Sequence, residues 1–276
     1  MADGSGLVDQ EGRVIDFGRT VVDYERHRPG FPDEFFDRLE HTGWLVEGQH
    51  ALDLGTGTGT LALGLAQRGM DVTGIDVAPE LLAAAREAAD DRGLAVRFVE
   101  GKAEATGQAD ARFELVTAGQ CWWWFDSDQA ISEALRVLVP GGRILICNFS
   151  YLPLTGNVAA RTEDLILGHN PGWPKAGWRG VHPEQIRALD QGGFTHVESF
   201  SYVVDVPFTH EDWRGRIRTC NGVGSSLAED QVRDFDNDLT KMLANEFPGD
   251  LIVPHRIFAT SGLKPRLQES DTRSQK

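Results

Sequence analysis

The chain has 276 residues, of which 42 are acidic and 27 basic, and its formal charge is −15 at pH 7. This length suits one large α/β domain with a substantial core, and the excess of acidic side chains argues against nucleic acids and anionic membranes as partners. Because no long apolar run is present and residues 1–12 lack the features of a secretory signal, we expect a cytoplasmic protein.

Short β-like runs alternate with helical stretches from residue 14 to residue 263, a pattern typical of a mostly parallel sheet with helices on both faces. We expect these residues to form one domain between disordered tails at residues 1–13 and 264–276, which are rich in Gly, Ser and charged residues. Strands are expected at residues 50–54, 71–76, 95–100, 113–119, 143–149, 195–204 and 251–260.

The first expected strand runs into a glycine-rich turn. Residues 51–60 read ALDLGTGTGT, so a hydrophobic strand is followed by Gly55, Gly57 and Gly59 and then by an apolar-periodic helix. Glycines permit a tight turn and let a ligand approach the backbone closely. A dinucleotide fingerprint would need another glycine at Thr60, so NAD and FAD do not fit this spacing.

Asp76 ends the second expected strand, 23 residues after Asp53. An acid at this position accepts hydrogen bonds from both hydroxyls of a ribose. The alternative is an ordinary turn beside a surface acid. The order strand, glycines, helix, strand and acid favours a nucleoside site.

The helix after the fourth expected strand carries a possible capping box formed by Asp126 and Gln129. We expect this helix to run to Val139, where Pro140-Gly141-Gly142 would end it.

Two connections, residues 150–181 and 205–250, are too long for simple loops, and the second is expected to contain helices from about His210 and Ala228. Long insertions beyond the strand ends of an α/β sheet usually carry function, so we interpret them as a helical cap over the substrate. Trp173, Trp178 and Trp213 are candidates for its apolar wall, and the alternative is that they only anchor the cap.

Other residue groups exclude several kinds of site. The three cysteines and eight histidines show no CxxC pair and no metal-ligand spacing, so no disulfide framework or metal site is expected. Arg214, Arg216 and Arg218 occupy alternate positions of an expected helix, and we interpret them as solvated surface residues instead of one basic stripe.

The sequence LDLGTGTGTLALGLAQRG, followed by VTGIDVAPELL, resembles the first two motifs of class I S-adenosylmethionine (SAM)-dependent methyltransferases. VEGKAEATG (99–107), VTAGQCWWWFD (116–126) and LRVLVPGGRILI (135–146) resemble the third to fifth motifs, so the resemblance covers about the first half of the chain. It implies a Rossmann-like seven-stranded sheet with an antiparallel last strand, and SAM as the cofactor. The cofactor-binding residues that it implies are Asp53, Gly55, Thr56, Gly57, Asp76, Val77, Ala103, Glu104 and Gln120.

Residues 16–32 resemble an N-terminal segment of the small-molecule branch, the group similar to trans-aconitate and quinone-pathway methyltransferases. In that branch a Tyr and an Arg-Pro cover the cofactor, which implies the same role for Tyr24 and Arg28. An ion pair of Arg28 with Glu25 or Glu34 on a helix surface is the alternative.

Trp122, Trp123 and Trp124 follow the fourth strand, where the resemblance places the reactive methyl group. Successive side chains cannot all face the same way, so we expect one to turn into the core and the others to wall a dry pocket. Relatives often have a His where this chain has Trp123. The resemblance therefore offers no general base at this position of the chain. The substrate-pocket candidates are Trp122, Trp123, Phe149, His169, Trp173, Trp178 and Trp213.

His182 is the candidate proton acceptor, because it precedes Pro183 at an expected helix start near the carboxyl edge of the sheet. The dipole of that helix would favour a neutral imidazole. An N-cap or surface histidine is the plainer alternative. His169 is a weaker candidate, and His255 is expected to be structural.

The sequence therefore predicts an enzyme that transfers the methyl group of SAM, by in-line displacement, to an O, N or C atom of a small apolar or aromatic molecule. Three alternatives stay open: an NAD-linked oxidoreductase, a SAM-binding enzyme of altered chemistry such as a cyclase, and a non-catalytic binding module.

Overall fold

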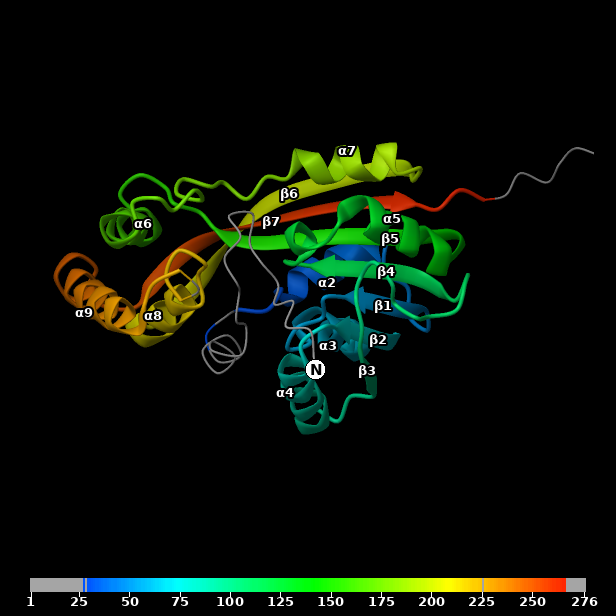
Figure 1. Ribbon diagram of the computed structural model, residues 1–276, viewed down its shortest axis with the longest axis horizontal. Helices are drawn as coiled ribbons and strands as arrows, with labels where there is room; N and C mark the ends of the chain where they lie inside the picture. Colours follow the sequence, from blue (N-terminus) through cyan, green and yellow to red (C-terminus); the bar gives the residue numbers. More distant parts are fainter. Residues whose placement is uncertain (1–26, 28, 225, 267–276) are drawn as a thin grey trace, which may run out of the picture.

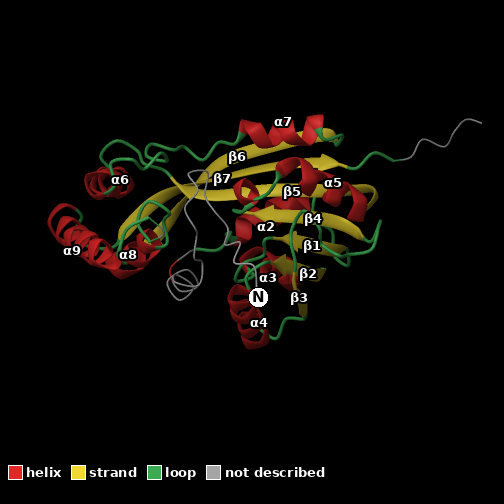
Figure 2. Ribbon diagram, in the orientation of Figure 1, coloured by secondary structure: helices red, strands yellow, loops and turns green. Residues whose placement is uncertain are grey.

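The computed structural model describes residues 27, 29–224 and 226–266, which form a seven-stranded sheet covered by helices on both faces (Figures 1 and 2). The strand order is β3-β2-β1-β4-β5-β7-β6, and β7 runs antiparallel to both of its neighbours. This confirms the predicted fold class. The strands are β1 (His50–Leu54), β2 (Asp71–Asp76), β3 (Val96–Glu100), β4 (Phe113–Gly119), β5 (Leu138–Tyr151), β6 (Thr195–Phe208) and β7 (Leu251–Leu263).

Two groups of helices cover the two faces of the sheet, and a third group lies beyond the ends of its long strands. The helices α2 to α4 pack on one face and α5 and α7 on the other, whereas α6, α8 and α9 lie beyond one end of the long strands (Figure 1). None of the helices in the described part of the chain is long and apolar enough to cross a membrane. Their bounds are α2 (Asp33–His41), α3 (Thr60–Gln67), α4 (Pro79–Asp91), α5 (Ser127–Val137), α6 (Val158–His169), α7 (Pro183–Gln191), α8 (His210–Arg218) and α9 (Glu229–Glu246).

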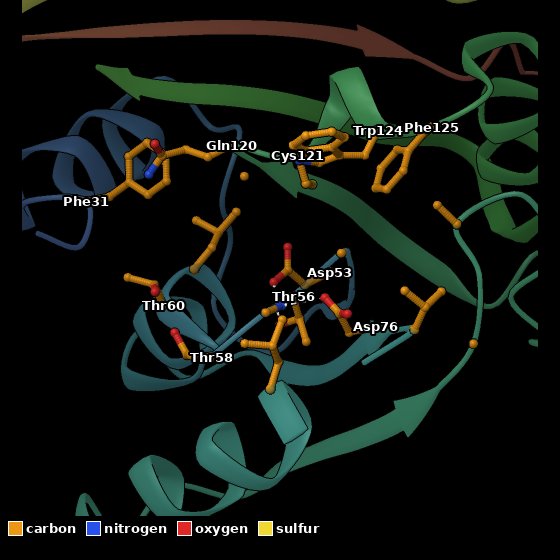
Figure 3. A pocket seen from close by; sticks show the side chains of 18 residues that line it. Phe31, Asp53, Thr56, Thr58, Thr60, Asp76, Gln120, Cys121, Trp124 and Phe125 are labelled. Carbon is orange, nitrogen blue, oxygen red and sulfur yellow. Dashed lines mark hydrogen bonds between the residues drawn. The ribbon is translucent and has the colours of Figure 1, made fainter. Parts of the chain in front are cut away.

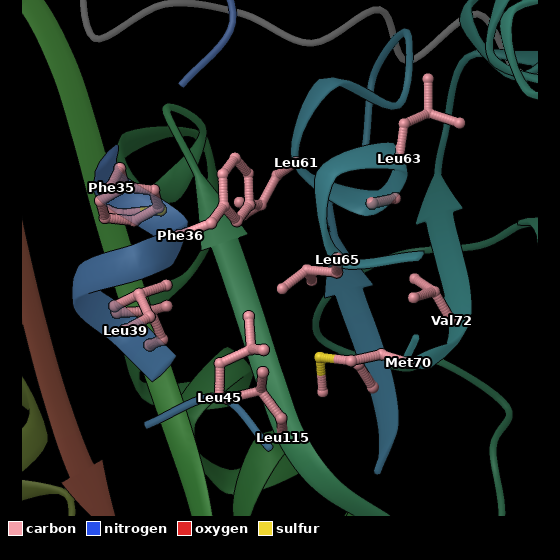
Figure 4. Close-up of a cluster of buried hydrophobic side chains, with 14 of the residues drawn as sticks. Phe35, Phe36, Leu39, Leu45, Leu61, Leu63, Leu65, Met70, Val72 and Leu115 are labelled. Atoms are coloured by element: carbon pink, nitrogen blue, oxygen red, sulfur yellow. The ribbon is translucent and has the colours of Figure 1, made fainter. Parts of the chain in front are cut away.

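The core on the α2–α4 face holds the glycine turn against the sheet. Phe35 and Leu39 of α2 and Leu65 of α3 are fully buried beside Leu115 of β4 (Figure 4). Burial of each such side chain contributes about 1.5–3 kcal/mol to folding. This packing fixes the start of α3, and with it the turn that follows β1.

The fifth strand is longer than the sequence predicted, and the helix before it is shorter. Asp126 caps α5 by accepting a hydrogen bond from the Gln129 N–H at 3.1 Å, but the helix ends at Val137 and not at Val139. The reason is that Leu138 already pairs with Phe113 of β4, so the Pro-Gly-Gly segment belongs to β5.

The two insertions form one helical cap, as predicted. The helices α6, α8 and α9 pack together around the ends of β5, β6 and β7, and their apolar side chains form a third core. Trp213, at 0% exposure, lies within that core and donates a hydrogen bond from its indole N–H to the Thr162 hydroxyl at 3.0 Å. The cap is therefore a packed unit joined to the sheet by continuous strands.

Candidate functional site

A pocket opens at the carboxyl ends of β1, β2 and β4, the edge where open α/β sheets bind ligands (Figure 3). The glycine turn forms one side, and the segment after β4 forms the other. The residues that line it are Phe31, Asp53, Gly55, Thr56, Gly57, Thr58, Thr60, Leu61, Asp76, Val77, Leu81, Gly101, Ala103, Gly119, Gln120, Cys121, Trp124 and Phe125.

The glycine turn needs its glycines for two different reasons. Gly55 and Gly57 have φ of 61° and 57°, a left-handed conformation that other residues adopt at a cost. A Cβ on Gly55 would lie 2.9 Å from the Cys121 sulfur, so packing excludes a side chain there. A Cβ on Gly57 would meet no heavy atom of the described residues within 4 Å. Gly57 therefore presents bare backbone to open space in the pocket.

Asp76, at the end of β2, faces this turn. Its Oδ2 accepts a hydrogen bond from the Gly57 N–H at 2.8 Å, and its Oδ1 accepts one from the Ala78 N–H at 3.0 Å. Burial raises the pKa of Asp76. Each carboxylate oxygen has a second acceptor position, so the side chain can hold the turn and still bind two ligand hydroxyls.

Asp53 lies beneath the turn with 1% exposure. Its two oxygens accept hydrogen bonds from the Thr56 hydroxyl at 2.7 Å and the Thr117 hydroxyl at 2.6 Å. Burial raises the pKa of Asp53 to about 6, against the opposing effect of these hydroxyls. Asp53 therefore ties the turn to β4, and this structural role accounts for both of its oxygens.

The opposite wall comes from the segment after β4. Gln120 has a positive φ of 58°, and its backbone N–H donates to the Cys147 carbonyl at 2.8 Å. Residues 122–124 then form a short 3₁₀ helix, in which successive side chains point about 120° apart. Trp122 turns into the core, whereas Trp124 lines the pocket with Phe125 (Figure 3).

Most of the predicted cofactor residues share this pocket, but Glu104 does not line it. Its carboxylate accepts a hydrogen bond from the Asp126 N–H at 2.9 Å. Tyr24 and Arg28 lie outside the described residues. The predicted residues among the pocket's lining are Asp53, Gly55, Thr56, Gly57, Asp76, Val77, Ala103 and Gln120.

Sequence reasoning missed Phe31, Trp124 and Phe125 as lining residues. A 3₁₀ turn in the Trp-Trp-Trp run would have shown which of the three rings faces the pocket, but the sequence contains no clear signal for it. Phe31 stands just before α2, far from the glycine motif in sequence, and only the tertiary fold brings it to the pocket.

The predicted substrate-pocket residues do not converge on one surface. Phe149 is buried behind Phe31, with ring centres 5.8 Å apart. Trp173 donates from its indole N–H to Asn221 at 3.1 Å and packs against Gly222 in the cap. Both Trp173 and Trp213 therefore anchor the cap, which is the alternative considered for them. His169, at the end of α6, lies 3.3 Å from Asp238 of α9.

His182 lies at the start of α7 with 6% exposure, outside the residues that line the pocket. Its ring stacks on Trp123 at 6.3 Å and meets Trp178 edge-on at 5.3 Å. Its Nδ1 lies 3.0 Å from the Glu184 carboxylate, while the buried Nε2 has no hydrogen-bond partner among the described residues. Burial lowers the pKa of His182, so the imidazole is neutral at pH 7.

Metal-binding groups are absent from the part of the chain that the structure describes, where no three His, Cys, Asp or Glu side chains are arranged to hold an ion. The pocket instead combines a carboxylate with spare acceptor positions, bare backbone and an aromatic wall.

Comparison with known proteins identifies residues 52–146 as matching a family model described as a methyltransferase domain. The chain is 39% identical over 132 residues to an uncharacterised methyltransferase of Mycobacterium tuberculosis and 48% identical over 101 residues to a demethylmenaquinone methyltransferase of Thermus thermophilus. These alignments cover 47% and 36% of this chain. The chain spans about half the length of these relatives, 50% and 46% respectively.

Solved structures share the fold over more of the chain. A provisionally named type II methyltransferase from Anaeromyxobacter dehalogenans has a TM-score of 0.63 at 22% identity, over 87% of this chain and 99% of its own. The cyclase SpnF has a TM-score of 0.53 at 21% identity, over 87% of this chain and 85% of its own. At such identities the likeness concerns the fold alone.

Proposed function

We propose that this chain, whose residues 52–146 match a methyltransferase domain model, binds SAM in the pocket beside the glycine turn and transfers the methyl group to an O, N or C atom of a small molecule. The observation that carries the proposal is that the Asp76 carboxylate lies directly beside the open space at Gly57. Together they offer two acceptor positions to a ribose and a close approach to backbone.

The charge of the site suits a cation. Asp53 and Asp76 are buried acids at the turn, and Trp124 and Phe125 present aromatic rings on the other wall. Carboxylates and aromatic faces both favour a positively charged sulfonium. Since an acid in the position of Asp76 also binds the ribose of dinucleotides, the glycine spacing is what supports SAM over NAD.

When bound, SAM supplies a methyl group that its sulfonium charge already activates. The chain's own contribution is then to position the acceptor and to exclude water. Phe31, Trp124 and Phe125 are the side chains placed to do so at the described wall. No step is assigned to His182, because it does not line the pocket and its ring packs against Trp123 and Trp178. A neutral amine, a carbanion or an already ionised oxygen would need no such base.

One experiment tests the proposal directly. The full chain is incubated with methyl-labelled SAM and fractionated metabolite extracts, and labelled products are identified together with the S-adenosylhomocysteine (SAH) formed. We expect a labelled small molecule and an equal amount of SAH. The Asp76→Ala variant serves as the control for label transfer outside this site.

Other outcomes identify the alternatives. SAM bound, with extract compounds converted but no SAH formed, would contradict methyl transfer and favour the altered chemistry represented among fold neighbours by a cyclase. Thermal stabilisation by NADH but not by SAH would point to an oxidoreductase. SAM binding without any conversion of SAM or extract would leave a non-catalytic binding module.

A further inference from the structure

Arg216, in the middle of the cap helix α8, is buried with 6% exposure. Within the described part of the chain no carboxylate forms an ion pair with it. Its Nη1 contacts the Cys220 sulfur at 3.4 Å, and its guanidinium carbon lies 5.4 Å from the centre of the Tyr151 ring. The buried acid that interacts with Tyr151, Glu163, accepts a hydrogen bond from the Gly177 N–H at 2.6 Å instead.

The neighbouring arginines of α8 behave differently. Arg214 and Arg218 both form ion pairs with Asp236 of α9 and with Glu211. Because residues two apart on a helix point to nearly opposite sides, Arg216 is directed into the cap core when these two face α9. The prediction that all three arginines are solvated is therefore wrong for Arg216.

A buried guanidinium without a counter-ion is costly, since it loses hydration and gains no carboxylate in return. Such a residue is a candidate for binding an anion that arrives from outside the chain. Arginine is also the side chain best shaped for a carboxylate, because its planar fork donates two parallel hydrogen bonds.

The position of α8 connects this guanidinium with the cofactor pocket. The His27 ring packs against Gly215, where an added Cβ would lie 2.1 Å from it, and its Nδ1 lies 3.1 Å from Asp212. Phe31, which lines the pocket, is four positions after His27, so the chain between them spans at most about 14 Å. The segment that leads to Phe31 at the pocket therefore packs against α8, the helix that carries Arg216.

A second buried side chain, beside Tyr151, has one nitrogen without a hydrogen-bond partner among the described residues. His255 of β7 has 0% exposure, and its ring lies edge-on to Tyr151 at 6.3 Å and 5.0 Å from Phe149. Its Nδ1 donates to the Val253 carbonyl at 2.9 Å, so Nε2 carries the lone pair, and no described group bonds to it. Burial lowers the pKa of His255 to about 3, which keeps Nε2 an acceptor at neutral pH.

We propose that Arg216 binds a carboxylate of the methyl acceptor, and that His255 accepts a hydrogen bond from a hydroxyl or amine of the same molecule. The acceptor is thus a small carboxylic acid whose body packs on the rings of Tyr151 and Phe149. This inference rests on the proposed function, since it assigns the acceptor of the same site.

The first test needs no substrate. Because Met keeps the apolar stem of Arg216 and removes the uncompensated charge, Arg216→Met should melt at or above the wild-type temperature. Arg214→Met is the matched control on the same helix, and it should melt lower because it loses its ion pair with Asp236. A fall in Tm for Arg216→Met as large as that of the control would overturn the proposal.

The second test uses matched ligands: a library of small hydroxy and amino carboxylic acids, each with its primary amide, titrated in the presence of saturating SAH. We expect acids to bind at least tenfold more tightly than their amides, and Arg216→Met to remove this difference while its SAH affinity stays at the wild-type value. Arg216→Lys should retain part of it. Amides that bind as well as acids, or a library in which no acid outbinds its amide, would overturn the proposal.

The two proposals fail in different ways. SAH binding is measured first and without any acid, so its absence refutes the cofactor site whatever the acids do. If SAH binds and the methyl acceptor proves to carry no carboxyl group, methyl transfer stands and the carboxylate site is refuted.

Discussion

At the scale of single residues, Asp76 is expected to contribute most to cofactor affinity. Replacing it with Ala removes the acceptors for both ribose hydroxyls, so SAH binding should weaken by about 1.5–3 kcal/mol, the range for charge-assisted hydrogen bonds. Isothermal calorimetry on the folded variant measures this change. Asp71→Ala is the control, because Asp71 begins the same strand at its opposite end, paired with His50 at 2.9 Å. Equal SAH affinity for wild type and Asp76→Ala would show that the cofactor site is elsewhere.

Gly57 provides a second test at this scale. Gly57→Val should abolish SAH binding, because the side chain would occupy the space where the ligand approaches the backbone. Gly93→Val is a matched control. Gly93 also has a positive φ, 64°, and room for a Cβ, but it follows α4 away from the pocket. The control should lose stability and keep SAH affinity, and retained binding in Gly57→Val would identify the turn as an ordinary one.

The two acids at the turn show what residue patterns can predict. Spacing was enough to place both Asp53 and Asp76 at the pocket, because a strand, a glycine turn and a second strand fix their positions along the chain. Their separate roles depend on Thr117, which lies 64 residues after Asp53 and reaches it only through the pairing of β4 with β1. Contacts of that kind leave no local signal.

At the scale of elements, the start of α7 was predicted correctly, but its histidine is placed differently from the expectation. Pro183 does begin the helix, yet His182 stacks on Trp123 and meets Trp178 edge-on, outside the residues that line the pocket. We therefore expect its ring to matter for packing. His182→Phe should retain methyl transfer within tenfold of wild type, and His182→Ala should chiefly lower the melting temperature.

The pH profile of methyl transfer tests the opposite case, in which His182 is a catalytic base. Because burial lowers the pKa of His182 below its usual 6.5, a catalytic His182 would lose activity only as the pH falls through that lowered value. Such an acidic limb in the wild type, missing in His182→Phe together with a 10²–10⁴-fold loss of rate, would restore the base that the sequence suggested. A flat profile would agree with catalysis by positioning.

In the cap, too, the helices could be predicted from the sequence, but the contacts of their side chains could not. Helices near His210 and Ala228 could be predicted from the sequence and are present as α8 and α9. The burial of Arg216 could not, because a local pattern does not tell which side of α8 meets the ends of β5 and β7. The lengths of β5, β6 and β7 were also underestimated, since each is extended by pairing with strands distant in sequence.

At the scale of the whole molecule, we expect the segment that connects the cap to the sheet to move when the acceptor binds, while the cap helices stay fixed. The core of the cap holds Trp213 and Leu239 fully buried, so its helices should exchange amide hydrogens slowly even in the free protein. Residues 170–181 differ, because this segment is largely irregular and carries Trp178, which is 43% exposed. It joins α6 of the cap to α7 beside the sheet.

Hydrogen exchange read by mass spectrometry should therefore show residues 170–181 gaining protection when SAH and an acceptor bind together, and less when SAH binds alone. Amides of β1 serve as the internal control and should not change, because that strand is paired on both sides by β2 and β4. Slow exchange throughout this segment in the free protein would refute a moving connection. The cap would then be a fixed wall, and acceptor choice would depend on its shape alone.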